Sequence, residues 1–464
     1  MELSDKFADS DYINNMNKKI IKKPAAKEDF QRKNKKVKVY SRLRGMRDTL
    51  FDEYRYWEVI NKKATELAAA YGYKRIETPV MEKLELYERS SGKTSDIVTK
   101  EMYSFVDKSG DKVALRPEAT PGLVRAYIEH GMFNLPQPVK MYWLGPVFRH
   151  DKPQAGRFRQ FNQYNLEMFG EAGPVGDAQL ILIAYNFFKE LQIDVQVQIN
   201  SIGCKDCRKD YLDKLVKYYK DKTRHNKLCL DCKKRLTKNP LRLLDCKEEK
   251  CVSLKTDAPQ IVDSLCESCR DHFVKVLEYL DETGINYNLD PFLVRGLDYY
   301  NRTVFEIWPE GDSEARQSSL GGGGRYDELV EFMGGRPTPA CGFGIGIERT
   351  ILKIKEKNIP LKQDDQIDIF LAQLGEAPRR KLMVLFEEFR KAGLKVAQLF
   401  TKDSLKIQLE EANRLGVKFS LILGQKELSD GTILIRDMES GVQEVVDLNK
   451  VKGEIEKRLN NQVK

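Results

Sequence analysis

Hydrophobic positions along the chain change their period several times, and each period predicts a different element. Between residues 52 and 71 they recur every three or four positions, which predicts an amphipathic helix that ends at Gly72. Between residues 139 and 170, two strand-like runs flank a basic loop that holds Pro153 and Gly156. Such runs on either side of a turn predict a long antiparallel hairpin.

The pattern changes again after about residue 362. Strand-like runs such as IDIFLAQL and VKFSLILG alternate there with helix-like runs such as PRRKLMVLFEEFRKAG. Two further short strands and a basic helix follow. This alternation predicts a compact α/β domain of about 100 residues at the C-terminal end of the chain.

The composition limits the class of protein. The chain has 464 residues, of which 41% are hydrophobic, and a formal net charge of +9. It contains no run of 18 apolar residues, and its first 17 residues lack the apolar segment of a secretory signal. We therefore expect a soluble cytoplasmic protein without membrane contact, whose charge permits a polyanionic partner but does not require one.

Basic residues dominate the segment from Lys18 to Lys38, and the apolar periodicity is absent there. Residues 1–40 are therefore expected to form a basic flexible N-terminal extension. Such a segment is either a solvated tail or an arm that contacts RNA phosphates, and the sequence leaves both open.

Eight of the nine cysteines lie close together in the sequence. They form four short-spaced pairs: Cys204 and Cys207, Cys229 and Cys232, Cys246 and Cys251, and Cys266 and Cys269. This spacing indicates one or two structural Zn²⁺ sites of four thiolates each, with reduced or disulfide-paired cysteines as the alternative. Cys341 stands apart in a glycine-rich strand and is expected to be a small core residue.

The second strand of the predicted hairpin carries Gln163, Asn165 and Glu167 at alternate positions. Because strand side chains alternate between faces, these three share one polar face, which is either a solvated sheet surface or the floor of a ligand pocket. The hairpin loop carries an arginine cluster that includes Arg149 and Arg157, and guanidinium groups suit phosphate.

Two further segments could carry chemistry. Alternating glycines at 342, 344 and 346 either clear one face of a strand for a ligand or allow a bend in packing. The run LVRGLDYYNRTVFEI, residues 293–307, places an arginine, an acid and two tyrosines close together. A tyrosine hydroxyl can donate to a ring nitrogen, and the arginine can neutralise developing negative charge.

Together these segments resemble the class II aminoacyl-tRNA synthetases, and within them the histidyl-tRNA synthetase family, over about residues 40–464. GYKRIETPVME, residues 72–82, is similar to the first class motif, which builds the dimer interface. Residues 147–167 and 342–350 are similar to the second and third motifs. LVRGLDYYNRTVFEI and GGGGRYDELV are similar to segments specific to the histidine enzymes.

The resemblance implies a fold and five regions. The fold would be an α+β catalytic domain with a mostly antiparallel sheet, interrupted by a small cysteine-rich insertion and followed by a C-terminal α/β anticodon-binding domain. The regions would be an N-terminal extension (1–40), the first part of the catalytic domain (41–199), the insertion (200–285), the second catalytic part (286–362) and the anticodon-binding domain (363–464).

The resemblance also implies an activity: ATP and Mg²⁺ would activate L-histidine, which would then pass to the 3′ end of tRNA(His), in a homodimeric enzyme. Arg295 and Arg149 would be catalytic. The residues expected to bind histidine are Glu118, Ala119, Thr120, Gln163, Glu167, Arg295, Tyr299 and Tyr300. Those expected to bind ATP are Arg149, Arg157, Phe161 and Arg349.

Two other functions are weighed against this one. A synthetase-like regulatory subunit of histidine biosynthesis would sense histidine without charging tRNA, but such relatives usually lack the anticodon-binding domain and the ATP arginines. A class II synthetase for another amino acid is the second alternative. A small apolar substrate would leave Glu167 and the two tyrosines unpaired.

Overall fold

The computed structural model describes residues 39–92, 95, 97–311, 319–361 and 367–461. Most of the predicted N-terminal extension, residues 1–38, therefore lies outside the described residues. No helix of the described part is long and apolar enough to cross a membrane.

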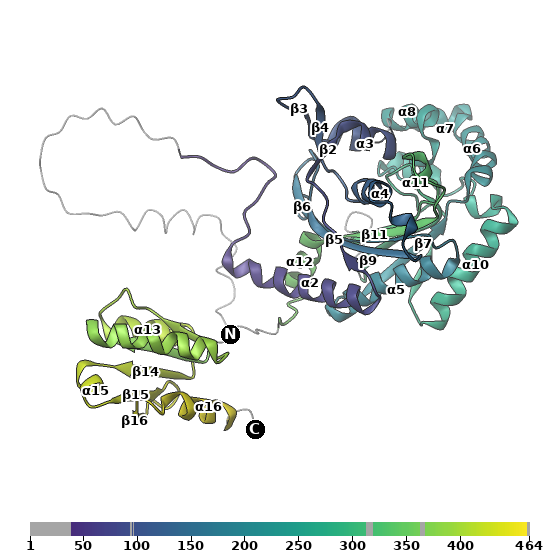
Figure 1. The fold of residues 1–464 in the computed structure, drawn as a ribbon. Coiled ribbons are helices and arrows are strands. Elements are labelled where there is room, and N and C mark those ends of the chain that lie inside the picture. Colours follow the sequence, from purple (N-terminus) through teal and green to yellow (C-terminus); the bar gives the residue numbers. More distant parts are fainter. Residues whose placement is uncertain (1–38, 93–94, 96, 312–318, 362–366, 462–464) are drawn as a thin grey trace, which may run out of the picture.

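An eight-stranded sheet forms the centre of the first domain (Figure 1). Its strands, in spatial order, are β1 (Lys74–Arg75), β5 (Val139–Phe148), β6 (Gln160–Phe169), β11 (Ala340–Gly346), β10 (Gly321–Arg325), β9 (Asn301–Pro309), β7 (Val195–Ser201) and β8 (Tyr287–Leu289). Only the two edge pairs, β1 with β5 and β7 with β8, are parallel. The mostly antiparallel sheet and the β5–β6 hairpin confirm the sequence predictions.

Helices pack against both faces of this sheet. The helices of this domain are α2 (Phe51–Ala70), α3 (Leu84–Ser90), α4 (Thr120–Glu129), α5 (Pro174–Glu190), α11 (Leu329–Phe332) and α12 (Ile347–Glu356). Apolar side chains of α2, α5 and α12 share one core with Tyr164, Leu166 and Met168 of β6. The even positions of β6 therefore face this core, and the odd, polar positions face the other side.

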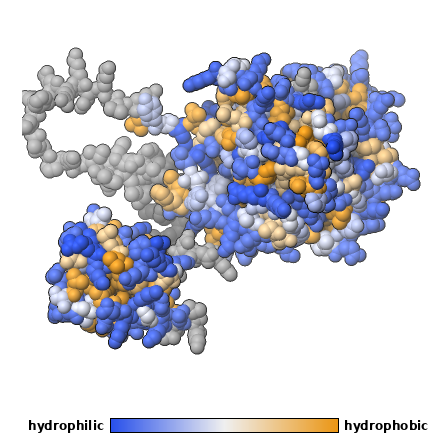
Figure 2. Space-filling model, in the orientation of Figure 1, coloured by the Kyte–Doolittle hydropathy of each residue, from blue (hydrophilic) through white to orange (hydrophobic). Residues whose placement is uncertain are grey.

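A small three-stranded sheet stands beside the large one. It consists of β2 (Met81–Lys83), β4 (Lys112–Leu115) and β3 (Ser104–Val106), all antiparallel. The predicted helix at 52–71 is confirmed as α2, and a left-handed Gly72 follows it. Figure 2 shows a largely hydrophilic surface with hydrophobic residues exposed where α2 begins, and Phe51 there is 93% exposed.

The cysteine-rich segment is helical. It contains α6 (Lys205–Lys220), α7 (Lys222–Lys227), α8 (Leu230–Lys238), α9 (Glu249–Lys255) and α10 (Glu267–Glu282), with 3-10 turns at Pro240–Leu243 and Ile261–Ser264. A buried ionic network ties its end to the sheet. Asp177 of α5 accepts hydrogen bonds from Arg325 of β10 and lies 3.0 Å from His272 of α10.

The C-terminal domain is the predicted α/β unit. Its five-stranded sheet has the order β13 (Val396–Gln398), β12 (Ile369–Gln373), β14 (Phe419–Leu423), β15 (Thr432–Asp437) and β16 (Gln443–Asp447). Its helices are α13 (Glu376–Lys391), α14 (Leu405–Arg414), α15 (Gln425–Ser429) and α16 (Val451–Asn461). The strands β13, β12 and β14 are parallel, because a helix lies between each of them and the next in the chain. The strands β15 and β16 are antiparallel to their neighbours.

Candidate active site

The polar face of β6 has space because the neighbouring strand lacks side chains there. Gly342 and Gly344 of β11 lie directly opposite Glu167 and Asn165. A Cβ atom added at Gly342 would lie 1.7 Å from Oε2 of Glu167. The alternating glycines therefore clear one face of the strand for other groups, which is the first of the two roles that the sequence left open.

Glu167 is held by hydroxyl groups in this cleared space. Its side chain is buried, and Oε1 accepts a hydrogen bond of 2.7 Å from Thr120 Oγ1. Oε2 accepts one from the hydroxyl of Tyr326. The tyrosine rings at 299 and 300 lie against Tyr326, with centroids 5.6 and 6.4 Å away. The acid thus lies at the base of an aromatic cage.

Burial controls the protonation of Glu167. The pKa of its carboxyl group is raised from 4.5 to about 8, mainly by burial and in smaller part by the charge of Glu118, while the hydrogen bonds donated by Tyr326 and Thr120 act in the opposite direction. A carboxyl group of this kind can accept a hydrogen bond or share a proton with a basic ring near neutral pH.

Glu118 forms a second buried acidic centre. Its Oε1 accepts a hydrogen bond of 2.6 Å from Ser91, and its Oε2 accepts one of 2.8 Å from the hydroxyl of Tyr299. Burial raises the pKa of this carboxyl group. Ala119, next in the chain, is buried against Trp143 and Val147, so its side chain belongs to the core.

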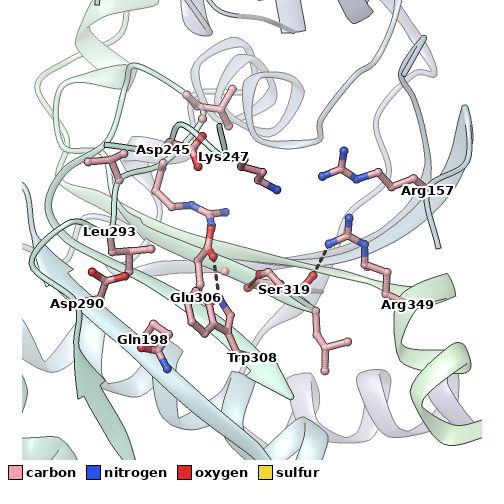
Figure 3. Close-up of a pocket in the computed structure, with 18 of the residues that line it drawn as sticks. Arg157, Gln198, Asp245, Lys247, Asp290, Leu293, Glu306, Trp308, Ser319 and Arg349 are labelled. Atoms are coloured by element: carbon pink, nitrogen blue, oxygen red, sulfur yellow. Dashed lines mark hydrogen bonds and ion pairs between the residues drawn. The ribbon is translucent and has the colours of Figure 1, made fainter. Parts of the chain in front are cut away.

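Three arginines face a large cavity of about 1380 Å³. Arg149 lies over the ring of Phe161, 5.5 Å from its centroid, and donates from Nε to the carbonyl of Pro117. Figure 3 shows Arg157 and Arg349 pointing into the cavity from one side. Burial and the charges of Arg157 and Arg149 lower the pKa of Arg349. Such a concentration of positive charge favours a polyanion such as a triphosphate.

Arg295 lines the same cavity. Its Nη1 lies 2.5 Å from Oε1 of Glu306, whose other oxygen accepts a hydrogen bond from Trp308 Nε1 at 3.0 Å. The guanidinium also lies 5.8 Å from the centroid of the Tyr300 ring. Arg295 therefore connects the charged cavity with the aromatic cage.

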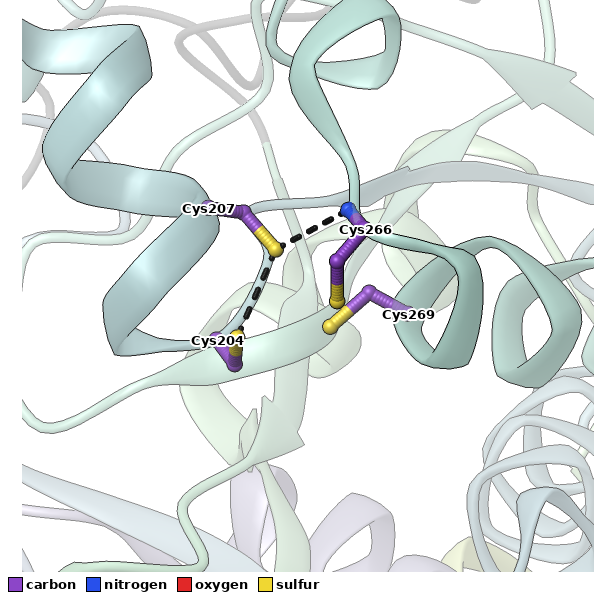
Figure 4. A group of neighbouring side chains, drawn as sticks. All are labelled: Cys204, Cys207, Cys266 and Cys269. Carbon is purple, nitrogen blue, oxygen red and sulfur yellow. Dashed lines mark hydrogen bonds between the residues drawn. The ribbon is translucent and has the colours of Figure 1, made fainter.

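The eight clustered cysteines separate into two groups of four. We call Cys204, Cys207, Cys266 and Cys269 the outer group (Figure 4), and Cys229, Cys232, Cys246 and Cys251 the inner group. Within each group the sulfur atoms all lie within 4.8 Å of one another. A tetrahedral zinc with Zn–S bonds of 2.3 Å needs sulfur atoms about 3.8 Å apart, so both groups fit that ion. Cys341 is buried in the core, as predicted.

Comparisons with known proteins agree with this geometry. The family model described as Histidyl-tRNA synthetase matches residues 45–350, and the model described as Anticodon binding domain matches residues 368–458. The chain belongs to the histidyl-tRNA synthetase family.

Curated relatives and solved structures support the same assignment. A histidine–tRNA ligase from Dehalococcoides mccartyi is 45% identical over 422 residues, which cover 91% of this chain and 100% of the relative. One from Natranaerobius thermophilus is 42% identical, covering 87% of this chain and 96% of the relative. The crystal structure of apo S. aureus histidyl-tRNA synthetase has a TM-score of 0.75 at 33% identity, covering 90% of this chain and 100% of that one.

A structure described as an ATP phosphoribosyltransferase regulatory subunit/histidyl-tRNA synthetase from Bacillus halodurans C is also similar. It has a TM-score of 0.59 at 22% identity and covers 84% of this chain and 99% of that one. At this identity the similarity shows the fold alone.

The predicted site residues occupy two connected zones of this family member. Arg149, Arg157, Phe161, Gln163, Arg295 and Arg349 line the cavity. Glu118, Thr120, Glu167 and Tyr300 lie buried behind it, and the hydroxyl of Tyr299 is bound to Glu118. Their roles toward ATP and histidine remain predictions.

Three contributors were not identified from the sequence. In the sequence, Tyr326 stands out only as a member of the glycine-rich segment GGGGRYDELV, yet its hydroxyl donates a hydrogen bond to Glu167. Ser91 supports Glu118, and Glu306 supports Arg295. Glu306 lies in the run LVRGLDYYNRTVFEI, 11 residues after Arg295, so the sequence itself offers this acid as a partner for the arginine. Nothing in the sequence marks Ser91, because only the fold brings it near Glu118.

Replacing Glu167 by Gln should stabilise the protein at high pH. The raised pKa means that the folded state holds the proton more tightly than the unfolded state, so stability falls as pH rises from about 4.5 to about 8. At one pKa unit per about 1.4 kcal/mol, Glu167→Gln should gain a few kcal/mol relative to wild type at pH 9 and little at pH 5. Urea unfolding at both pH values measures this, and an equal difference at both would contradict the assigned burial.

Proposed function

We propose that this chain is a histidine–tRNA ligase, which converts L-histidine and ATP to histidyl-adenylate and pyrophosphate and then transfers histidine to the 3′ end of tRNA(His). The observation that carries the proposal is the buried Glu167, held by the hydroxyl groups of Thr120 and Tyr326, beside an arginine-lined cavity. The buried acid and its tyrosines fit a polar ring, and the arginine-lined cavity fits a triphosphate.

The cavity would hold ATP. Phe161 would stack on adenine, Arg149 would bind the α-phosphate and Arg349 the γ-phosphate, with Arg157 adding positive charge. Arg157 lies 3.3 Å from Asp151, a carboxylate that triphosphate would replace as its partner. Catalysis of displacement at phosphorus rests on positioning and charge neutralisation, and three arginines at one cavity supply both.

The buried zone would hold histidine. Glu118, Thr120 and Gln163 would bind the α-amino group, while Glu167 and the pair Tyr299 and Tyr300 would bind the imidazole. The hydroxyl of Tyr299 also donates a hydrogen bond to Glu118. The substrate's own carboxylate would then lie toward Arg295 and attack the α-phosphorus, so no activated serine or cysteine is needed. Arg295 would neutralise the charge that develops on the phosphoryl oxygens.

Mg²⁺ would neutralise the phosphates of bound ATP. It takes oxygen ligands, and most of them come from the phosphates and water in sites of this kind. Glu306 and Glu348 offer carboxylates at the cavity wall, which fits the one or two protein ligands that the ion needs. Zn²⁺ would occupy the cysteine groups in a structural role, since four thiolates leave no open coordination position.

The C-terminal domain would bind the anticodon part of tRNA(His), and the charging reaction would take place in the cytoplasm, where translation uses its product. The matched segment 368–458 supports this role. The regulatory alternative is weakened by the same domain and by the retained Arg149 and Arg349, which sensing histidine alone would not require.

Histidine-dependent exchange of pyrophosphate into ATP tests the function directly. Wild-type protein should exchange with histidine and not with other amino acids. Histidine binding without any exchange would instead support the regulatory alternative.

Replacing Arg295 by Ala should lower the rate of adenylation by at least about 100-fold, because the charge is needed mainly in the transition state. The dissociation constant for histidine should change by less than about fivefold. Arg295→Lys, which keeps one positive charge, is the matched control and should lose less. Single-turnover kinetics and calorimetry separate the two quantities, and near-normal exchange in Arg295→Ala would show that the assigned role is wrong.

A homodimer is expected through the small sheet. Met81 of β2 lies in the segment similar to the first class motif and is 53% exposed. Val106 of β3, in the same three-stranded sheet, is 62% exposed. Wild type should sediment at twice the chain mass, and Met81→Glu combined with Val106→Glu should shift it toward the monomer. Val175→Glu, at an apolar position of α5 that is 45% exposed, should not change the mass. A monomeric wild type would refute the expectation.

A further inference from the structure

The inner cysteine group shares its surroundings with the aromatic cage. Cys232, Cys246 and Cys251 belong to the same apolar core as Tyr300 and Tyr326. Two of the group's members, Cys229 and Cys246, also line the cavity that contains Arg295. The group is therefore part of the wall of the active site.

The lobe that carries the inner group is built from short segments. It consists of α8, a 3-10 turn and α9, which have nine, four and seven residues. A metal ion would crosslink these segments in addition to the apolar core that they share with Tyr300 and Tyr326. The backbone N–H groups of Cys229 and Cys232 donate to the sulfur atoms of Cys251 and Cys229, both at 3.3 Å. N–H donors of this kind stabilise the thiolate form that binds metal.

The lobe holds the segment that carries Arg295 and the tyrosine pair. Asn239, between α8 and the 3-10 turn, donates from Nδ2 to Oδ1 of Asp298 at 2.6 Å. Arg242 lies against Gly296, where an added Cβ would be 3.1 Å from its Nη1. In Figure 3, Asp245 and Lys247 of the same lobe lie at the cavity that Arg157 and Arg349 enter from the other side.

The outer group secures the same segment from its other end. Cys204 and Cys207 lie where the chain enters α6, and Cys266 and Cys269 lie where α10 begins. Arg208, the residue after Cys207, donates to the carbonyl of Tyr300 at 2.6 Å. Residues 295–300 are thus fixed at Asp298 by the inner lobe and at Tyr300 by the start of α6.

We propose that each group binds one Zn²⁺ and that the two ions together position residues 295–300, so that zinc occupancy sets the affinity of the site for histidine. The histidine part of this inference rests on the proposed function. The metal part does not, because it follows from the two sets of sulfur atoms. These cysteines are positioning residues, because the contacts that reach the segment come from Asn239 and Arg208.

Metal analysis of the purified full chain should give two Zn²⁺ per chain. Cys232→Ser and Cys269→Ser should each retain one ion and raise the KM for histidine in pyrophosphate exchange by about tenfold or more, as loss of a supporting residue typically does. The matched controls Cys232→His and Cys269→His keep a ligand atom and should keep both the second ion and a KM near that of wild type. Asn239→Ala should keep two ions and still raise the KM.

Other outcomes would overturn the inference. Fewer than two ions in wild type would reject the double site, and a serine variant that loses an ion with unchanged KM would reject the positioning role. If a serine variant does not fold, timed chelation of wild type gives the same answer, with zinc release followed by absorbance and histidine affinity by calorimetry. Wild type that holds two ions but shows no exchange would refute the proposed function and leave the metal sites standing.

Discussion

The site depends on a strand without side chains lying beside a strand that carries a large polar side chain. Glu167 projects from β6 into the volume that a side chain at position 342 of β11 would occupy, and no residue larger than glycine leaves room for it. Gly322 of β10 has the same relation to Arg295, whose Nη1 would lie 2.8 Å from an added Cβ. The bare strands leave room over the centre of the sheet for the buried carboxyl group of Glu167 and the half-buried guanidinium of Arg295.

Charge is arranged along this face in two zones. Buried carboxyl groups at Glu118 and Glu167 lie at one end, and the arginines at 149, 157 and 349 lie at the other. Histidine carries an α-amino group and a basic ring, which suit the two acids, and a carboxylate, which suits the arginines, so these charges favour one orientation of the bound amino acid. Burial raises the pKa of both acids, and burial together with the like charges of Arg157 and Arg149 lowers the pKa of Arg349. The amino group and ring of histidine and the phosphates of ATP would supply opposite charge to these two sets of groups.

Local patterns predicted the elements and the polar strand, because periodicity depends only on neighbouring residues. The α2 helix, the β5–β6 hairpin and the odd face of β6 all follow from such spacing. Resemblance to a family supplied the site residues that spacing alone left undecided.

Contacts between distant segments could not be predicted in the same way. The pairing of Cys204 with Cys266, some 60 residues apart, rather than with Cys229 depends on how α6 and α10 start side by side. The contact between Tyr326 and Glu167 likewise depends on the order of the strands. The length of β1 also depends on the assembled sheet, since only two of its residues pair with β5 at the sheet edge.

A crystal structure of the protein with L-histidine bound tests the central claim most directly. The account predicts an imidazole nitrogen within about 3 Å of a Glu167 carboxylate oxygen, between the rings of Tyr300 and Tyr326, with the substrate carboxylate directed toward Arg295. Histidine bound elsewhere, with Glu167 still held only by Thr120 and Tyr326, would contradict it.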